Sequence, residues 1–262
     1  MRKRRILIGV GLVLLSGVCA LVLLRRRAAR YEVLLSEGLP FFPASAGAVG
    51  DRRDLLLVPF MGQHVLRFSH DGGLQQDPVL SLPTFVNRCV ICPDGDGGAA
   101  VVASSSVYAV GGAGLPARTA IALRLPEGAR FLADGRLLVW GDPGVALVGG
   151  KGSEGWHSPT GGIVCDVDTD RPGSRAYAVT LDHDVFAIDL ADGRVVRKAR
   201  LHSLRLHVGP HIAITGESAY VVSGCYVVRL DTASLAEVAR LELPGEPLGI
   251  HAAAPDGPPG TW

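Results

Sequence analysis

A chain of 262 residues that is 48% apolar and 19% charged is too apolar to stay disordered, and its 34 glycines and 17 prolines suit short strands joined by tight turns. Lys and Arg (26) nearly balance Asp and Glu (25), but the residues around the N-terminal segment hold many of the basic groups. The remaining chain is therefore acidic and has no electrostatic footprint for nucleic acid, so no nucleic-acid partner is expected. The basic residues in question are Arg2, Lys3, Arg4, Arg5, Arg25, Arg26, Arg27, Arg30 and Arg52.

The N-terminal segment predicts a membrane anchor. A basic flank at residues 1–5 precedes an uncharged apolar run at residues 6–24, and a basic linker at residues 25–30 follows. As a helix the run would extend roughly 28 Å, close to the hydrocarbon thickness of about 30 Å. The run stays apolar up to the arginines, which favours one uncleaved transmembrane helix over a cleaved signal peptide.

The orientation of this single-pass anchor follows only weakly from charge, because the two basic flanks are nearly equal. The slight preference is for a cytoplasmic N-terminus. A lone N-terminal anchor usually exports the domain that follows it. We therefore expect residues 31–262 on the extracytoplasmic side, in the periplasm or at the cell surface.

An internal repeat organises these residues. Apolar runs begin at positions 55, 99, 137, 176 and 219, with spacings of 44, 38, 39 and 43 residues. A second series begins in step with the first, at positions 65, 107, 145, 185 and 227. A period of about 40 residues is typical of β-propeller blades. Strand-forming runs this short and regular leave no room for helices.

Each repeat predicts an inner strand, two middle strands and an outer strand. The predicted fold is an all-β propeller with five complete blades and a partial sixth. The inner strands are expected within residues 82–95, 125–135, 210–216 and 247–257, and residues 31–35 resemble an outer strand that completes the last blade. Three alternatives stay open: five blades with an overlap, an incomplete ring, or a chain that lacks its C-terminal part.

Two segments resemble known propeller repeats. Residues 230–239 (LDTASLAEVA), with residues 247–250 and 255–257 after them, resemble the YVTN-type repeat. Residues 185–196 (VFAIDLADGRVV) are similar both to that repeat and to the quinoprotein repeat. The resemblance implies a propeller, a fold that hosts sugar-lactone hydrolases, redox enzymes and binding modules alike. Arg197 stands where the quinoprotein repeat has a docking tryptophan, which argues against quinone binding.

One acidic segment is a candidate metal site. Asp166, Asp168 and Asp170 alternate along the chain, and three carboxylates could converge on Ca²⁺. The segment lacks the glycine and the distal glutamate of a helix-loop-helix calcium site. Because aspartate also serves turns, a turn is the favoured interpretation and no cofactor is expected.

Four cysteines lie beyond the anchor, at Cys89, Cys92, Cys165 and Cys225. In a strand, Cys89 and Cys92 would point to opposite faces about 10 Å apart, which is beyond disulfide reach. Buried thiols are favoured, and a bridge from Cys89 or Cys92 to Cys165 is the alternative. No second CxxC or CxxCH motif is present, so structural zinc and covalent haem are unsupported.

Polar residues near the expected starts of inner strands are the candidate binding site, since those positions surround one mouth of a propeller channel. Solvated loop residues without a common target are the alternative. The candidates are Asn87, Arg88, Arg130, His157, His207, His211 and His251.

No serine-nucleophile, phosphate-loop or dinucleotide motif is present. We therefore predict a membrane-anchored extracytoplasmic binding or scaffold module for a protein or small-molecule ligand. One alternative is a metal-dependent, lactonase-like hydrolase that uses His211 and Asp166 at the channel mouth. Another alternative is an envelope redox protein.

Overall fold

The computed structural model describes residues 43–49, 54–69, 73–74, 78–86, 88–111, 113–149, 155–202 and 209–245. These residues form β-strands and connecting turns, and no helix occurs among them. The chain divides into a unit of residues 1–42 and a unit of residues 43–262, and only the second contains described residues.

Five antiparallel sheets contain all the described strands. The first sheet has β1 (Pro43–Val49), β2 (Asp54–Pro59), β3 (Gly62–Ser69), β4 (Gly73–Leu74) and β5 (Leu80–Val86). The second has β6 (Cys89–Pro93), β7 (Ala99–Ala103), β8 (Ser106–Val110) and β9 (Arg118–Ala120). The third has β10 (Leu125–Phe131), β11 (Leu137–Asp142), β12 (Gly144–Val148) and β13 (Trp156–Pro159). The fourth has β14 (Val164–Thr169), β15 (Arg175–Thr180), β16 (Asp184–Asp189) and β17 (Val195–Arg200). The fifth has β18 (His211–Thr215), β19 (Ser218–Ser223), β20 (Tyr226–Asp231) and β21 (Glu237–Glu242).

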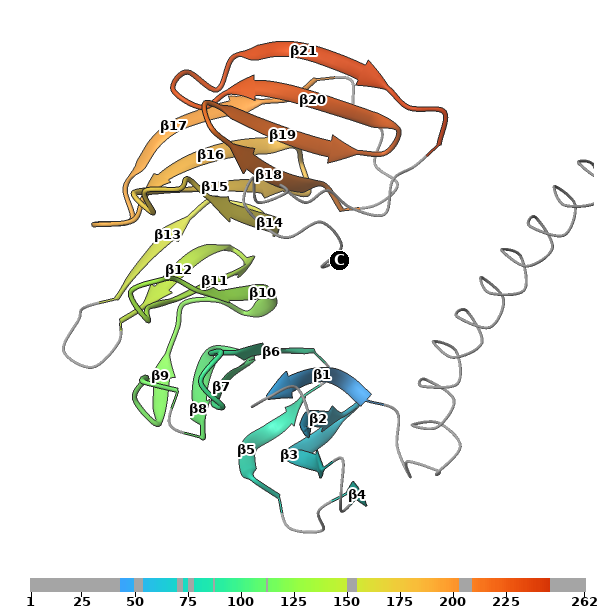
Figure 1. Ribbon diagram of the computed structural model, residues 1–262, viewed down its shortest axis with the longest axis vertical. Helices are drawn as coiled ribbons and strands as arrows, with labels where there is room; N and C mark the ends of the chain where they lie inside the picture. Colours follow the sequence, from blue (N-terminus) through green and yellow to red (C-terminus); the bar gives the residue numbers. More distant parts are fainter. Residues whose placement is uncertain are drawn as a thin grey trace, which may run out of the picture. The chain divides into compact units, whose positions relative to one another are not determined.

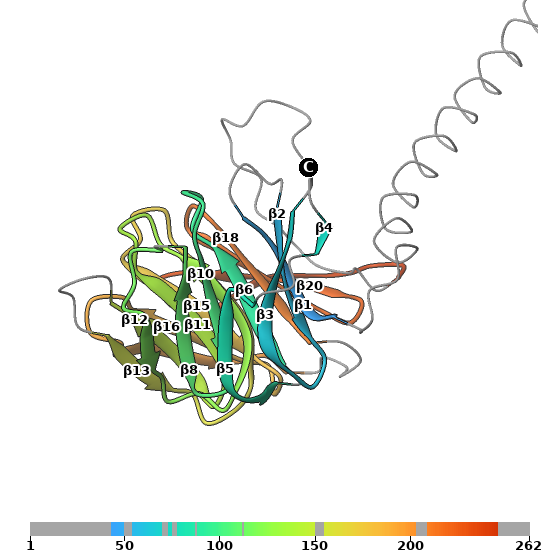
Figure 2. The same ribbon diagram turned by 90° about the horizontal axis from the view of Figure 1, so that it is seen from below.

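The sheets are the blades of a propeller. In Figure 1 they follow one another around a common centre, and the first strand of each sheet (β1, β6, β10, β14 or β18) lies nearest to it. Neighbouring sheets share hydrophobic cores, and Figure 2 gives a second view of the sheets, turned by 90°. Strands connected as a meander and repeated radially leave only short, protected sheet edges, at the inner and the outer strand of each blade, which is the usual propeller solution for an all-β chain.

The two series of apolar runs are confirmed as the middle strands of the blades. The first series forms β2, β7, β11, β15 and β19, and the second forms β3, β8, β12, β16 and β20. One expectation was wrong in part. Residues 82–86 belong to β5, which pairs with β3 of the first sheet, and the inner strand of the second blade begins only at Cys89. Since β4 pairs only with Phe68 and Ser69, the rest of the outer edge of β3 is open to β5.

The middle strands are mostly apolar at their central positions because both of their faces pack against neighbouring blades. In β7, Ala99 and Val101 pack toward the first blade, whereas Ala100 and Val102 pack toward the third. In the same way, Ala178 packs toward the third blade. Successive side chains of a strand point to opposite faces, so an uninterrupted apolar run is what a blade with two neighbours requires.

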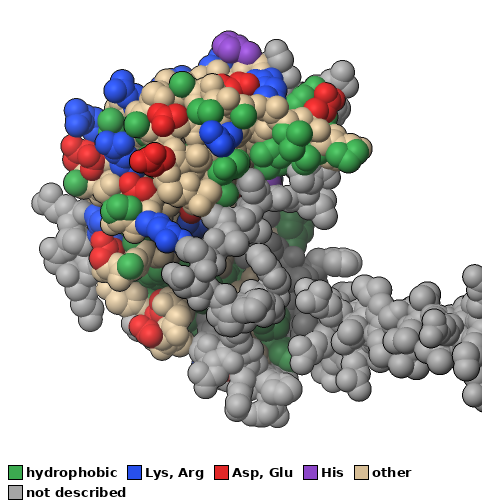
Figure 3. All heavy atoms as spheres, turned by 45° about the horizontal axis from the view of Figure 1, so that its top comes forward, with side chains coloured by type: hydrophobic (Ala, Val, Ile, Leu, Met, Phe, Trp, Pro, Cys, Tyr) green, Lys and Arg blue, Asp and Glu red, His purple; other side chains and the backbone are tan. Residues whose placement is uncertain are grey.

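Basic and acidic side chains are mixed on the surface of the blades. On the face shown in Figure 3, Lys and Arg are interspersed with Asp and Glu, and no large region of one sign covers it.

The predictions for the two ends of the chain lie outside the described residues. They concern the anchor at residues 6–24, the outer strand at residues 31–35 and the partial blade at residues 247–257. Within the part that the structure describes, no helix has the length and apolarity needed to cross a bilayer.

Candidate functional site

Charged side chains connect neighbouring inner strands. Arg88, directly before β6, forms an ion pair with Glu127 of β10. Arg130 of β10 donates from Nη1 to Oδ1 of Asp168 on β14. Nδ1 of His211 on β18 lies 3.4 Å from Oδ2 of Asp166 on β14. We call these six residues the inner-strand cluster.

Two carboxylates of the cluster also accept backbone hydrogen bonds from the next blade. The amide of Ile212 donates to Oδ2 of Asp166 (3.0 Å), and the amide of Ile214 donates to Oδ2 of Asp168 (2.8 Å). β18 pairs with β19 on one side only. Backbone amides on its other side need acceptors, and the aspartates of β14 supply them. These contacts place Asp166 beside Ile212 and Asp168 beside Ile214. Because the residue numbers rise together along both strands, β14 and β18 run in the same direction.

The cationic partner of each arginine pair is the more exposed one. The side chain of Arg88 is 58% exposed against 26% for Glu127, and that of Arg130 is 46% exposed against 18% for Asp168. Each guanidinium uses a single nitrogen, Nη1, in its ion pair. A guanidinium carries five N–H donors, so both arginines keep donors that can reach solvent or a ligand.

The three aspartates of the predicted calcium site have separate roles. Asp166 and Asp168 lie on β14 and face β18, as described above. Asp170 lies beyond the strand and accepts hydrogen bonds from the amides of Ser174 (2.7 Å) and Arg175 (3.0 Å). No group of three or more His, Cys, Asp or Glu side chains suited to a metal occurs among the described residues. The geometry of Asp170 is that of the turn alternative.

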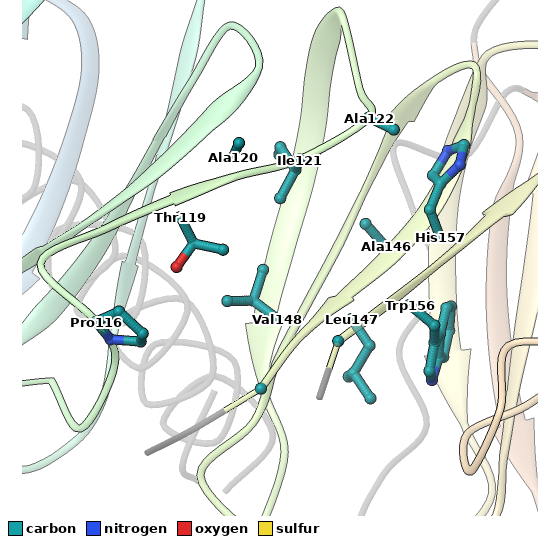
Figure 4. A pocket seen from close by; sticks show the side chains of 12 residues that line it. Pro116, Thr119, Ala120, Ile121, Ala122, Ala146, Leu147, Val148, Trp156 and His157 are labelled. Carbon is teal, nitrogen blue, oxygen red and sulfur yellow. The ribbon is translucent and has the colours of Figure 1, made fainter. Parts of the chain in front are cut away.

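His157 is not on an inner strand. It lies on β13, the outermost strand of the third blade, opposite Ala146 of β12. There it lines a cleft of about 510 Å³ between the outer parts of the second and third blades, shown in Figure 4. The expected position was wrong because the four residues of β13 include no apolar run that marks an outer strand. Burial lowers the pKa of the His157 imidazole below its usual value.

Three of the predicted binding-site residues lie in parts of the chain that the structure does not describe. Asn87, His207 and His251 lie outside the described residues. Of the predicted site residues, the structure therefore brings together Arg88, Arg130 and His211, with Asp166 and Asp168 from the metal prediction.

The cysteines confirm the strand argument for the CxxC pair. Cys89 packs in the core between the first and second blades, and Cys92 packs in the core between the second and third. All four cysteines are thiols, and Cys165 and Cys225 are partly buried. Burial, reinforced by the carboxylates of Glu127, Asp166 and Asp182, raises the pKa of the Cys165 thiol to about 11. A thiol with this pKa is a poor nucleophile at neutral pH.

Sequence reasoning missed Glu127, the partner of Arg88. The signal that could have found it is positional: Arg88, Glu127 and Asp166 follow one another at intervals of 39 residues. Equivalent positions of successive inner strands lie side by side, so charges repeated at the blade period predict contacts between blades.

The comparisons with known proteins show the fold. No family model matches the chain, and no curated protein matches it. The solved structure of apo AztD from Citrobacter koseri is 14% identical, with a TM-score of 0.56, and the match covers 79% of this chain and 62% of that one. The chain thus spans about three fifths of the length of AztD.

Two lyase structures are similar to the same extent. Virginiamycin B lyase from Staphylococcus aureus is 9% identical, with a TM-score of 0.55, and 79% of this chain and 73% of that chain are covered. A streptogramin B lyase structure is 13% identical, with a TM-score of 0.56, and 78% and 70% are covered. At such identities the similarity establishes a β-propeller-like fold and carries no activity with it.

Replacing Asp168 separates its two roles. Asp168→Ala removes both the acceptor of the Ile214 amide and the partner of Arg130, and we expect a loss of about 1–3 kcal/mol in the free energy of unfolding. Asp168→Asn keeps an oxygen for the amide and should lose distinctly less. Urea unfolding of the full chain in detergent micelles, followed by tryptophan fluorescence, measures both. Equal losses in the two variants would show that the backbone hydrogen bond contributes nothing.

Proposed function

We propose that the chain is a membrane-anchored, extracytoplasmic propeller that binds a ligand with an acidic group, a carboxylate or a phosphate, at the inner-strand cluster. One observation carries the proposal. Charged side chains from four adjacent inner strands, or directly before them, pair across the blades, and in both arginine pairs the guanidinium is more exposed than the carboxylate.

The orientation of the charges explains the preference for an acid. The carboxylates of Asp166 and Asp168 are occupied by backbone amides of β18 and are mostly covered. The groups left to meet a ligand are the unused N–H donors of Arg88 and Arg130, with the half-exposed imidazole of His211 beside Asp166. Guanidinium groups pair well with carboxylates and phosphates, and hydrogen bonds to charged groups are the stronger ones.

The test uses citrate and inorganic phosphate as probes, titrated calorimetrically into the full chain in detergent micelles at constant ionic strength. Loss of two charge-assisted contacts in the double variant Arg88→Gln/Arg130→Gln should weaken binding by about tenfold or more. The matched control is Arg194→Gln, which removes an exposed arginine from the turn before β17. Equal binding by the double variant and the control, or no binding by the wild-type chain, would contradict the proposal.

The predicted anchor determines on which side of the membrane the propeller would bind its ligand. The proposal rests here on the uncharged run at residues 6–24 and its basic flanks. The test applies an amine reagent that does not cross membranes to cells whose outer envelope has been made permeable and whose inner membrane is intact. We expect mass spectrometry to find label on Lys198, which is exposed on β17, and none on Lys3, before the anchor. Label on Lys3 with Lys198 protected would reverse the orientation.

A second candidate function, a lactonase-like hydrolase, is supported by one contact. Asp166 lies beside His211, and a carboxylate that orients an imidazole is the usual partner of a histidine base. In this case the purified chain would retain a divalent cation and hydrolyse a lactone, and His211→Ala would abolish turnover. Elemental analysis without metal, together with absence of turnover, would exclude this function and leave acid binding untouched.

A further inference from the structure

The cleft beside His157 exists because an outer strand is short. β9 has only three residues, and the chain then passes through Ile121 and Ala122 toward the inner strand β10. The outer part of the third blade, formed by β12 and β13, is therefore not covered by a full strand of the second blade. In Figure 4 the side chains of Thr119 and Ile121 lie on one side and that of His157 lies across the cleft.

The lining is uncharged and largely apolar. The small side chains of Ala120, Ala122 and Ala146 leave the space open, and Ile121 and Val148 supply larger apolar surface. Burying apolar ligand surface against such walls is favourable by roughly 25 cal/mol per Å². A charged ligand would find no opposite charge among the lining residues, so its desolvation would not be offset.

His157 is the distinctive polar group of the cleft. Its Nε2 is shielded from solvent and has no hydrogen-bond partner among the described residues. Leaving a buried polar atom unsatisfied is costly. Because burial lowers the pKa of the ring, the imidazole is neutral at pH 7 and Nε2 is either a donor or an acceptor.

We propose that this cleft is a second binding site, independent of the inner-strand cluster, for an uncharged, mainly hydrocarbon molecule that carries a hydroxyl group. A hydroxyl both donates and accepts, so it satisfies Nε2 in either tautomer of the ring. A turn of the imidazole about its Cβ–Cγ bond, a soft torsion, brings Nε2 toward the ligand. The volume of about 510 Å³ accommodates a molecule with two fused rings.

Three matched probes test the chemistry: 2-naphthol, naphthalene without the hydroxyl, and 2-naphthoate with a charge. The full chain, labelled with ¹³C in its alanine methyl groups, is titrated in detergent micelles. The methyl signals of Ala120, Ala122 and Ala146 report on the cleft itself. We expect 2-naphthol to bind about fivefold more tightly than naphthalene, as for one added neutral hydrogen bond, and 2-naphthoate not to shift these signals.

The decisive variant is His157→Phe, which keeps a ring on β13 without the nitrogen. It should abolish the preference for 2-naphthol over naphthalene, and because both proteins are measured in the same micelles, partitioning into detergent cancels. Ala146→Leu, which fills the cleft, should abolish binding of both probes. Shifts that persist in Ala146→Leu, an unchanged preference in His157→Phe, or no shifts in the wild-type chain would overturn the proposal. Citrate binding in these variants should be unchanged. The experiment therefore tests the proposal for the cleft separately from the proposal for the inner-strand cluster.

Discussion

The structure depends on covering both faces of apolar middle strands in the centre of each blade. A strand such as β7, apolar at all five positions, cannot be half-exposed as in an ordinary antiparallel sheet. Its odd-numbered residues enter the core shared with the preceding blade and its even-numbered residues enter the core shared with the following blade. The cores between blades are thus linked in series, and each blade buries its apolar faces against its neighbours.

Where blades meet at their inner strands, apolar packing gives way to charge. Backbone ladders hold strands together within a sheet, but β14 and β18 belong to different sheets. Aspartate carboxylates replace the missing ladder by accepting the amides of Ile212 and Ile214. The same carboxylates hold Arg130 and lie against His211, so one set of contacts both joins the blades and orients the groups that can meet a ligand.

The fold could be predicted from the sequence because short apolar runs recur in two series at the blade period. The inner-strand cluster could be predicted only in part. The segment at residues 166–170 was interpreted as a turn because aspartate readily serves turns. Asp166 and Asp168 lie instead in β14, where their carboxylates accept amides of β18, a contact that the local sequence does not reveal. His157 was misplaced and Glu127 was missed, since a four-residue outer strand and a lone glutamate have no pattern of their own.

The alternation of β7 between two cores also limits how such a chain can change in length. Insertion of a single residue within a middle strand would turn every following side chain of that strand to the opposite face. Each of these side chains would then point into the core on the other side of the blade. Insertions in the turns leave this parity intact. The repeat onsets lie 38 to 44 residues apart, whereas the onsets of paired middle strands lie only 8 to 10 residues apart, so most of the difference in repeat length falls outside the paired middle strands.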